Sequence, residues 1–197
     1  ENRGGYYQLS SMHDHDANLY FIALVPGEEL REKVRMIKER IRAEYNAGHA
    51  LKSPAHITLQ MPFKRSGADE QTIIDTLSLF AAGEAAFDIH LDGFGCFAPR
   101  VIFIRLVNPE PVIGLHRRLR PLLLDSLGFA EGEIMKSVQP HMTVATRDLT
   151  KQAFAEAWSE FQDEEFTGSF SVSSLFLMKH NGRHWDIFRE FAFRADG

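Results

Sequence analysis

Two short stretches of sequence decide the expected fold: Pro54-Ala55-His56-Ile57-Thr58-Leu59 and Pro140-His141-Met142-Thr143-Val144. Each contains a histidine, an apolar residue, a threonine and a second apolar residue, with a proline just upstream. Strand side chains alternate between faces, so a histidine and a threonine two residues apart point the same way. Each stretch is therefore predicted to set an imidazole beside a hydroxyl on one face of a strand, with its apolar residues turned into a core.

A series of alternating elements surrounds the first stretch. An apolar, aromatic-rich run precedes it, and an amphipathic helical pattern that stops near Gly48 separates the two. A second helix is expected to start near Asp69, a residue type that caps helices well. The predicted strands of this half are 18–26, 55–63, 87–97 and 101–107, the last two joined by a hairpin at 98–100.

The same order begins again in the second half. A helix carries apolar residues from Val112 to Leu122, and Pro121 is expected to kink or divide it. The second histidine strand, 140–147, is followed by a helix that carries Phe154, Ala157, Trp158 and Phe161. Two strands, 170–180 and 184–193, are predicted to close the chain around Asn181-Gly182, because Asn-Gly is a strong hairpin signal.

The spacings of the two halves agree. From Gly27 to His56 is 29 residues and from Pro109 to His141 is 32, while the two histidines precede their hairpin turns by 43 and 40 residues. An internal duplication follows. The predicted fold is α+β: a bilobal, pseudo-twofold arrangement in which two antiparallel sheets line a central cleft, with helices on the outside.

Composition narrows the classes of protein that fit. With 197 residues, 44% hydrophobic and 25% charged, the chain is long enough for one core or two small lobes. No apolar run approaches the roughly 18 residues of a membrane span, and no secretory signal pattern is seen. A single cysteine, Cys96, excludes an internal disulfide framework and a multi-cysteine zinc site. We therefore expect a cytoplasmic protein without membrane contact, and a monomer.

Charge bears on the partner. The net charge of −5 argues against an extended surface for nucleic acid, because neutralising phosphates supplies most of the affinity of such a surface. A nucleotide or a short RNA end in a locally basic cleft remains compatible with this charge. Residues 1–17 are expected to form a disordered or added leader, with Met12 as the native start, and 18–197 a single two-lobed domain. His13 and His15 in the leader could bind stray metal, but a mobile tail is the preferred interpretation.

The paired motifs predict a chemistry. Opening a phosphodiester needs a base that takes a proton from the attacking oxygen and an acid that protonates the leaving oxygen. Histidine suits both roles because its pKa is about 6.5. His56 and His141 would supply the pair, and Thr58 and Thr143 would donate hydrogen bonds to phosphoryl oxygens where charge develops. No cofactor and no metal is required.

The motif is specific because it occurs twice. Among nine histidines, only His56 and His141 fit this pattern, and they occupy equivalent positions of the repeat. A single copy would arise by chance fairly often. The alternative is a pair of half-buried strand histidines whose threonines reflect only the strand preference of that residue.

His56-Ile57-Thr58-Leu59 and His141-Met142-Thr143-Val144 resemble the paired HxTx motifs of the two-histidine (2H) phosphoesterase superfamily. That group includes bacterial 2′-5′ RNA ligases and RNA or nucleotide cyclic phosphodiesterases. The resemblance extends from about Asn18 to Phe193 and implies the same bilobal α+β fold. It also implies that the two histidines and two threonines are catalytic, in an RNA-processing phosphoesterase. The implied substrate is a nucleotide or RNA end with a 2′,3′-cyclic phosphate or a 2′,5′ linkage, and the reverse reaction would be ligation.

Strand alternation adds two candidate binding residues. Lys64 shares the parity of His56, and Arg147 shares that of His141, so both are predicted to line the cleft. Each is six to eight residues from its histidine, roughly 20–26 Å along a strand, so a neighbouring phosphate is their expected contact. A solvated cation at a strand end is the competing interpretation.

Two other functions remain open on sequence alone. The chain could be a module that binds nucleotides or RNA ends without turnover, although a lapsed enzyme need not keep all four motif residues. It could also hold a metal through His56, His141 and the amino-terminal histidines. The motif histidines lack a carboxylate partner, which fits poorly with usual ligand patterns. Activity in excess chelator distinguishes the metal site from the acid–base pair.

Overall fold

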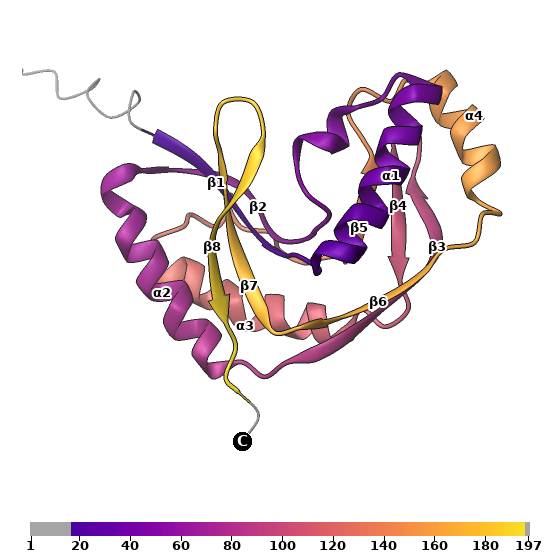
Figure 1. The fold of residues 1–197 in the computed structure, drawn as a ribbon. Helices are drawn as coiled ribbons and strands as arrows, with labels where there is room; N and C mark the ends of the chain where they lie inside the picture. The colour runs from indigo at the N-terminus through magenta and orange to yellow at the C-terminus, as the bar shows by residue number, and fades with distance from the viewer. Residues whose placement is uncertain (1–16, 196–197) are drawn as a thin grey trace, which may run out of the picture.

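The computed structural model describes residues 17–195, which form two four-stranded antiparallel sheets (Figure 1). Residues 1–16 of the predicted leader, with His13 and His15, lie outside the described residues. Its last residue, Ala17, begins β1. The first sheet has the order β2-β1-β7-β8 and the second β5-β4-β3-β6. Their strands are β1 (Ala17–Leu24), β2 (Ile57–Ser66), β7 (Ser174–His180) and β8 (Trp185–Ala192), and β3 (Phe87–Phe97), β4 (Val101–Leu106), β5 (His141–Ala145) and β6 (Thr167–Val172). The expected α+β fold with two antiparallel sheets is confirmed.

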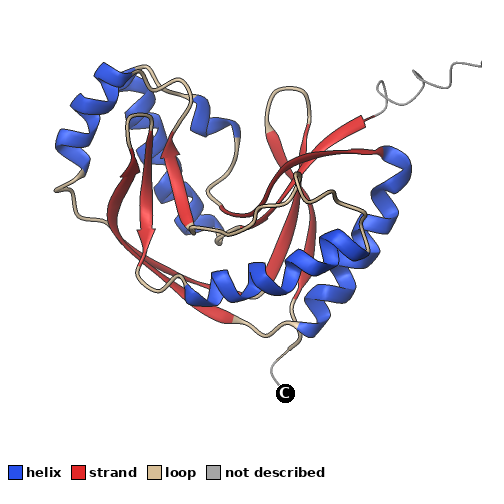
Figure 2. Ribbon diagram, turned by 180° about the vertical axis from the view of Figure 1, so that it is seen from behind, coloured by secondary structure: helices blue, strands red, loops and turns tan. Residues whose placement is uncertain are grey.

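Each sheet is covered by one helix from each half of the chain. Helices α2 (Glu70–Gly83) and α3 (Glu110–Asp125) pack against the first sheet, whereas α1 (Glu28–Tyr45) and α4 (Lys151–Phe161) pack against the second (Figure 2). Thus α1, which connects two strands of the first sheet, crosses to cover the other one. The halves of the sequence are interleaved, and each lobe is built from both.

Strand β1 explains the apolar run that opens the fold. Its residues Tyr20–Leu24 are all buried because β1 lies between β2 and β7 and both of its faces are covered. Tyr20 and Ile22 face the main core, while Phe21 and Ala23 pack with Met178 on the opposite face, toward the space between the lobes. A strand covered on both faces is expected to be apolar throughout.

The closing segment differs from the prediction. The single strand expected over 170–180 is divided at Ser173: β6 pairs with β3 in the second sheet, and β7 pairs with β1 in the first. The two parts differ in burial. Alternate residues of β6 are exposed, whereas β7 begins with consecutive buried residues, as its central place in the first sheet requires. One nearly continuous stretch therefore joins the two lobes.

Pro121 does not divide its helix. The helix α3 runs from Glu110 to Asp125 with Pro121 on its exposed side. Proline removes one helical hydrogen bond. The buried face of α3, which includes Val112, Leu115 and Leu119, continues across that position and holds the helix against the core.

The two histidine-bearing strands meet where the lobes join. Strands β2 and β5 are edge strands of their sheets, and their Cα atoms approach within 8 Å. His56 lies one residue before β2, and His141 is the first residue of β5. The pseudo-twofold arrangement thus brings the two motifs to one junction.

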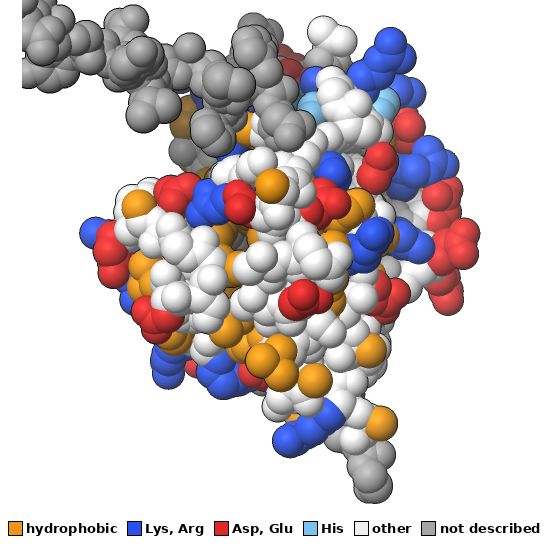
Figure 3. Space-filling view, turned by 90° about the vertical axis from the view of Figure 1, so that its left-hand side faces the viewer, with side chains coloured by type: hydrophobic (Ala, Val, Ile, Leu, Met, Phe, Trp, Pro, Cys, Tyr) orange, Lys and Arg blue, Asp and Glu red, His pale blue; other side chains and the backbone are white. Residues whose placement is uncertain are grey.

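The side of the molecule on which α2 lies carries charges of both signs. Figure 3 shows Lys and Arg side chains interspersed with Asp and Glu over this face, in keeping with the 22 Lys and Arg and 27 Asp and Glu of the sequence. Among the described residues, no helix combines the length and apolar character that a bilayer span would require.

Helix α2 offers a test of the core. Leu77 is fully buried, whereas Leu79 is 79% exposed two residues along the same helix. Leu77→Ala is expected to lower the free energy of unfolding by roughly 2–5 kcal/mol, because it leaves a cavity. Leu79→Ala should change it by no more than about 0.5 kcal/mol. Equal effects of the two substitutions in urea denaturation would contradict this packing.

Candidate active site

A pocket with a volume of about 480 Å³ lies at the junction of the lobes. Both motif histidines and both motif threonines line it, so the duplicated motif is gathered around one space. The remaining wall comes from β1, β2, the β3–β4 hairpin, the segment before β5 and the start of β8, together with residues 49–53 and 146–147. Its lining residues there include Phe21, Met61, Pro62, Phe97, Val101, Met135, Val138, Gln139 and Trp185.

The imidazoles of His56 and His141 are held in the same way. Nδ1 of His56 lies 2.8 Å from the carbonyl oxygen of Pro54, and Nδ1 of His141 lies 2.7 Å from that of Gln139. A carbonyl oxygen only accepts hydrogen bonds, so Nδ1 carries the proton in both rings. The Nε2 atom of each ring is consequently the nitrogen that can exchange a proton with a ligand in the pocket.

Aromatic rings fix both imidazoles from the side. The ring of Phe21 lies 4.8 Å from His56, and those of Phe97 and Phe103 lie 5.0 and 5.1 Å from His141, between ring centroids. Phe103 can occupy this place because Gly95 faces it across the sheet, where a Cβ atom would come within 2.6 Å of the Phe103 ring. The histidines therefore have little freedom to turn away from the pocket.

Burial lowers the pKa of both histidines. It lowers the pKa of His56 to about 4, against the opposing effect of the Pro54 carbonyl, and the charges of Lys38 and His141 lower it further. Burial also lowers the pKa of His141, and the Gln139 carbonyl opposes this effect. An anion in the pocket would raise both pKa values, because it favours the imidazolium form.

The charges of the side chains that line the pocket favour an anionic ligand. No Asp or Glu is among the residues that line it, within the part of the chain that the structure describes, whereas Lys52 and Arg147 are. Thr58 and Thr143 are half-buried, and neither hydroxyl has a hydrogen-bond partner among residues 17–195. Both hydroxyls are free to donate to a bound oxygen.

The two candidate binding residues are placed differently. Arg147 lines the pocket at its exposed rim, near His49, whose pKa is lowered chiefly by burial and then by the Arg147 charge. Lys64 is exposed and is not part of the lining. The pairing of β1 with β2 shifts register on both sides of Gln60, which interrupts the alternation from which Lys64 was placed in the cleft. A contact of Lys64 with a more distant phosphate stays a prediction.

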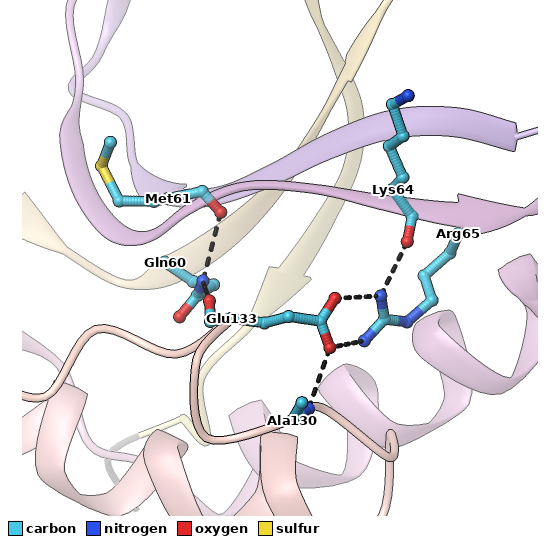
Figure 4. A network of polar contacts seen from close by, with 6 residues as sticks. All are labelled: Gln60, Met61, Lys64, Arg65, Ala130 and Glu133. Carbon is cyan, nitrogen blue, oxygen red and sulfur yellow. Dashed lines mark hydrogen bonds and ion pairs between the residues drawn. The ribbon is translucent and has the colours of Figure 1, made fainter.

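Gln60, at the register shift of β2, binds the loop before β5 through its side chain (Figure 4). Its side chain is fully buried and holds the segment that leads to β5. Its Nε2 donates to the Glu133 carbonyl at 2.8 Å and to that of Met61 at 3.2 Å, and its Oε1 accepts from the Met135 amide at 3.4 Å. Arg65 adds an ion pair to Glu133 at 2.9 Å. These contacts fix the segment that carries Met135, Val138 and Gln139 into the pocket wall.

The segment before His56 is held in a reciprocal manner. Asp148, which follows β5, accepts hydrogen bonds from the amides of Gly48 and His49 at 2.9 and 2.8 Å. From the other side, the buried Lys38 donates to the carbonyls of Ala50 and Ser53 at 3.0 and 3.1 Å. Residues 48–53, including the short helix η1 (His49–Lys52), are therefore fixed on both sides just before the histidine.

Much of the pocket wall comes from residues that no sequence pattern assigns to the site. Phe21, His49, Phe97, Met135 and Trp185 were not assigned to the site, because their places depend on strand order and loop packing. Phe21 and Phe97 had one usable signal: each is an aromatic residue within a predicted strand. The described residues contain no group of three or more His, Cys, Asp or Glu placed to hold a metal ion.

Comparison with known proteins identifies the family. Residues 26–184 match the family model described as the 2′-5′ RNA ligase superfamily. The chain belongs to this superfamily. The resemblance to 2H phosphoesterases drawn from the two motifs is thereby confirmed.

Known proteins and solved structures resemble this chain over most of its length. The protein named "Putative phosphoesterase SSP1770" of Staphylococcus saprophyticus is 24% identical over 174 residues, which cover 86% of this chain and 96% of that one. The crystal structure of TT0787 of Thermus thermophilus matches with a TM-score of 0.64 at 21% identity, over 91% of this chain and 100% of that one. E. coli LigT in its apo form matches with a TM-score of 0.63 at 20% identity, over 91% and 99%. At these identities the structural matches show a shared fold.

The hydrogen bonds to Pro54 and Gln139 predict the tautomer of both histidines. In ¹⁵N NMR spectra at pH 8, the neutral rings of His56 and His141 should carry their proton on Nδ1, with His56→Ala and His141→Ala serving to assign the signals. Both pKa values should lie below about 6.5 in the free protein and rise when sulfate is added. An Nε2–H tautomer for either ring would contradict the proposed orientation.

Proposed function

We propose that this protein is a metal-independent phosphoesterase that opens a 2′,3′-cyclic phosphate or a 2′,5′-phosphodiester of a nucleotide or RNA end. The observation that carries the proposal is the matched orientation of two imidazoles. Each uses Nδ1 to hold a backbone carbonyl two residues upstream, and both rings line a pocket without a carboxylate among its described lining residues. Membership of the 2′-5′ RNA ligase superfamily supports phosphoester chemistry.

The reaction follows from the two Nε2 atoms. The neutral imidazole takes a proton from water as the water oxygen attacks phosphorus, in line with the bond that breaks. The protonated imidazole gives its Nε2 proton to the leaving 3′ oxygen, so a cyclic phosphate becomes a 2′-phosphate beside a free 3′ hydroxyl. The two histidines end with their protonation states exchanged, and solvent restores them. With a 5′ hydroxyl in place of water as the nucleophile, the same transfers join the cyclic end to that hydroxyl as a 2′,5′ diester with a free 3′ hydroxyl.

The threonines and cations would stabilise the charge that develops. Thr58 and Thr143, which line the pocket, would donate hydrogen bonds to the non-bridging phosphoryl oxygens, where negative charge increases in the transition state. Lys52 and Arg147 add positive charge at the rim. Related structures agree with a nucleotide ligand, since E. coli LigT has been crystallised with 3′-AMP and with ATP.

The paired chemistry predicts how the variants behave. His56→Ala and His141→Ala should each lower kcat for a 2′,3′-cyclic nucleotide by about 10²–10⁴-fold. Thr58→Val and Thr143→Val should lower it less, by about 10²-fold, because each removes one donor to the phosphoryl group. The double histidine variant should be little worse than either single one, since the two groups act as a unit.

His90→Ala provides the matched control. His90 is an exposed histidine on β3 outside the pocket lining, so its loss should leave kcat unchanged. Multiplicative losses in the double histidine variant would contradict the acid–base pair.

The pH profile tests both the pair and its environment. Activity should fall at low pH, where the base becomes protonated, and at high pH, where the acid loses its proton. Because burial lowers the pKa of both histidines, the optimum of kcat/KM should lie below about pH 6.5. The optimum of kcat should lie at higher pH, because bound phosphate raises both pKa values. The limits belong to the coupled pair.

Excess EDTA should leave these profiles unchanged between about pH 5 and 9. Loss of activity in the chelator and its recovery with a divalent ion would make the protein a metallohydrolase, and the proposed mechanism would then be wrong.

A further inference from the structure

A second groove adjoins the histidine pocket. It has a volume of about 540 Å³ and shares Lys52, Ser53 and Trp185 with the first pocket. One of its walls is a face of α1 from Glu28 to Arg42, and the other is formed by residues 51–55 and 184–185. At 1.5 Å per residue, that helical face is about 21 Å long. The two pockets therefore adjoin along Lys52, Ser53 and Trp185.

The groove is basic although the chain is acidic. Five Lys and Arg side chains line it against three Glu, in a protein whose net charge is −5. Arg35 and Arg42 are paired with Glu32 and Glu39. Arg31 and Lys52, by contrast, form no ion pair with any carboxylate in the described chain.

A buried cation lies in the same wall. Lys38 is only 3% exposed, and its ammonium group uses two of its three donors on the carbonyls of Ala50 and Ser53. Burial lowers the pKa of Lys38 to about 8, so the group is mostly charged at neutral pH. Its charge therefore adds a fixed positive potential behind the segment that the two pockets share.

The shared wall also offers an aromatic surface. Trp185 packs edge-on against Phe21, with 4.7 Å between ring centroids, and Phe21 in turn lies 4.8 Å from the His56 ring. Trp185 is half-buried, so part of its ring remains accessible at the point where the pockets meet. A cationic groove with an accessible aromatic ring is the usual combination for holding single-stranded nucleic acid.

We infer that this groove binds the nucleotide that precedes the reacting end: the phosphate that links it to the reacting nucleoside lies near Arg31 and Lys52, and its base lies against Trp185. The substrate is then the 3′ end of an oligonucleotide, in preference to a free mononucleotide. This inference rests on the proposed function, because it takes the reacting phosphate to lie between His56 and His141. The fixed turn 48–53 separates the two phosphate sites and sets their spacing.

A chain-length series tests the inference. Three substrates are compared: adenosine 2′,3′-cyclic phosphate, the same compound with a 5′-phosphate, and the dinucleotide ApA ending in a 2′,3′-cyclic phosphate. We expect kcat/KM to rise with the 5′-phosphate and to be roughly tenfold or more higher for the dinucleotide than for the first compound.

Arg31→Ala isolates the second groove, because Arg31 does not line the histidine pocket. This variant should remove most of the gain from the 5′-phosphate and leave kcat/KM for adenosine 2′,3′-cyclic phosphate unchanged. It should also reduce the slope of log KM for the dinucleotide against log salt by about one. Arg117→Ala, which removes an exposed arginine on α3, is the matched control and should change none of these values.

The outcomes separate this inference from the proposed function. Equal kcat/KM values for the three substrates, or an equal loss for all of them in Arg31→Ala, would overturn the inference while leaving the histidine chemistry in place. If no substrate is turned over, the proposed function fails. Calorimetric binding of 2′-AMP and of ApA with a terminal 2′-phosphate then decides: a tighter dinucleotide complex that depends on Arg31 supports the groove, and equal affinities exclude it.

Discussion

The meeting of the edge strands β2 and β5 is the contact on which the rest of the structure depends. An edge strand has one side without a partner strand, and here the two edges approach each other where the lobes join. Each brings one histidine to the junction, at or just before the start of the strand. In the proposed mechanism, neither imidazole could act alone as both acid and base. The site exists only because the two halves of the chain are held at one separation.

That separation is maintained by contacts that are reciprocal between the halves. The segment before β5 is held by Gln60 and Arg65 from β2, and the segment before β2 is held by Asp148 beyond β5. Each histidine strand thus anchors the chain that leads into its counterpart. Because the backbone carbonyls that orient the two imidazoles lie in or beside these same segments, lobe spacing and ring orientation are set together.

The sequence predicted the parts of the site that are local and repeated. His56 with Thr58, and His141 with Thr143, could be placed on common faces because strand alternation needs only two residues of regular backbone. The same alternation failed farther along β2, where register shifts around Gln60 depend on pairing with β1. Pairing between strands so distant in sequence, as of β7 with β1 and of β6 with β3, is likewise invisible to local pattern. The division of 170–180 between two sheets was missed for this reason. Trp185 and Met135 joined the pocket through hairpin and loop packing, for which the sequence offered no periodic signal.

The interleaving of the halves also constrains how the chain can fold during synthesis. Strand β1 lies between β2 and β7, so the first sheet cannot close until residues near Lys179, the partner of Tyr20, have left the ribosome. Helix α1 must likewise wait for the second sheet that it covers. Pairing of residues so distant in sequence makes folding slow in comparison with chains rich in local contacts. All strands of the second sheet and both helices that cover it precede β7, so the second lobe can form before the first. Until β7 is made, the chain presents the apolar β1 without one of its neighbours.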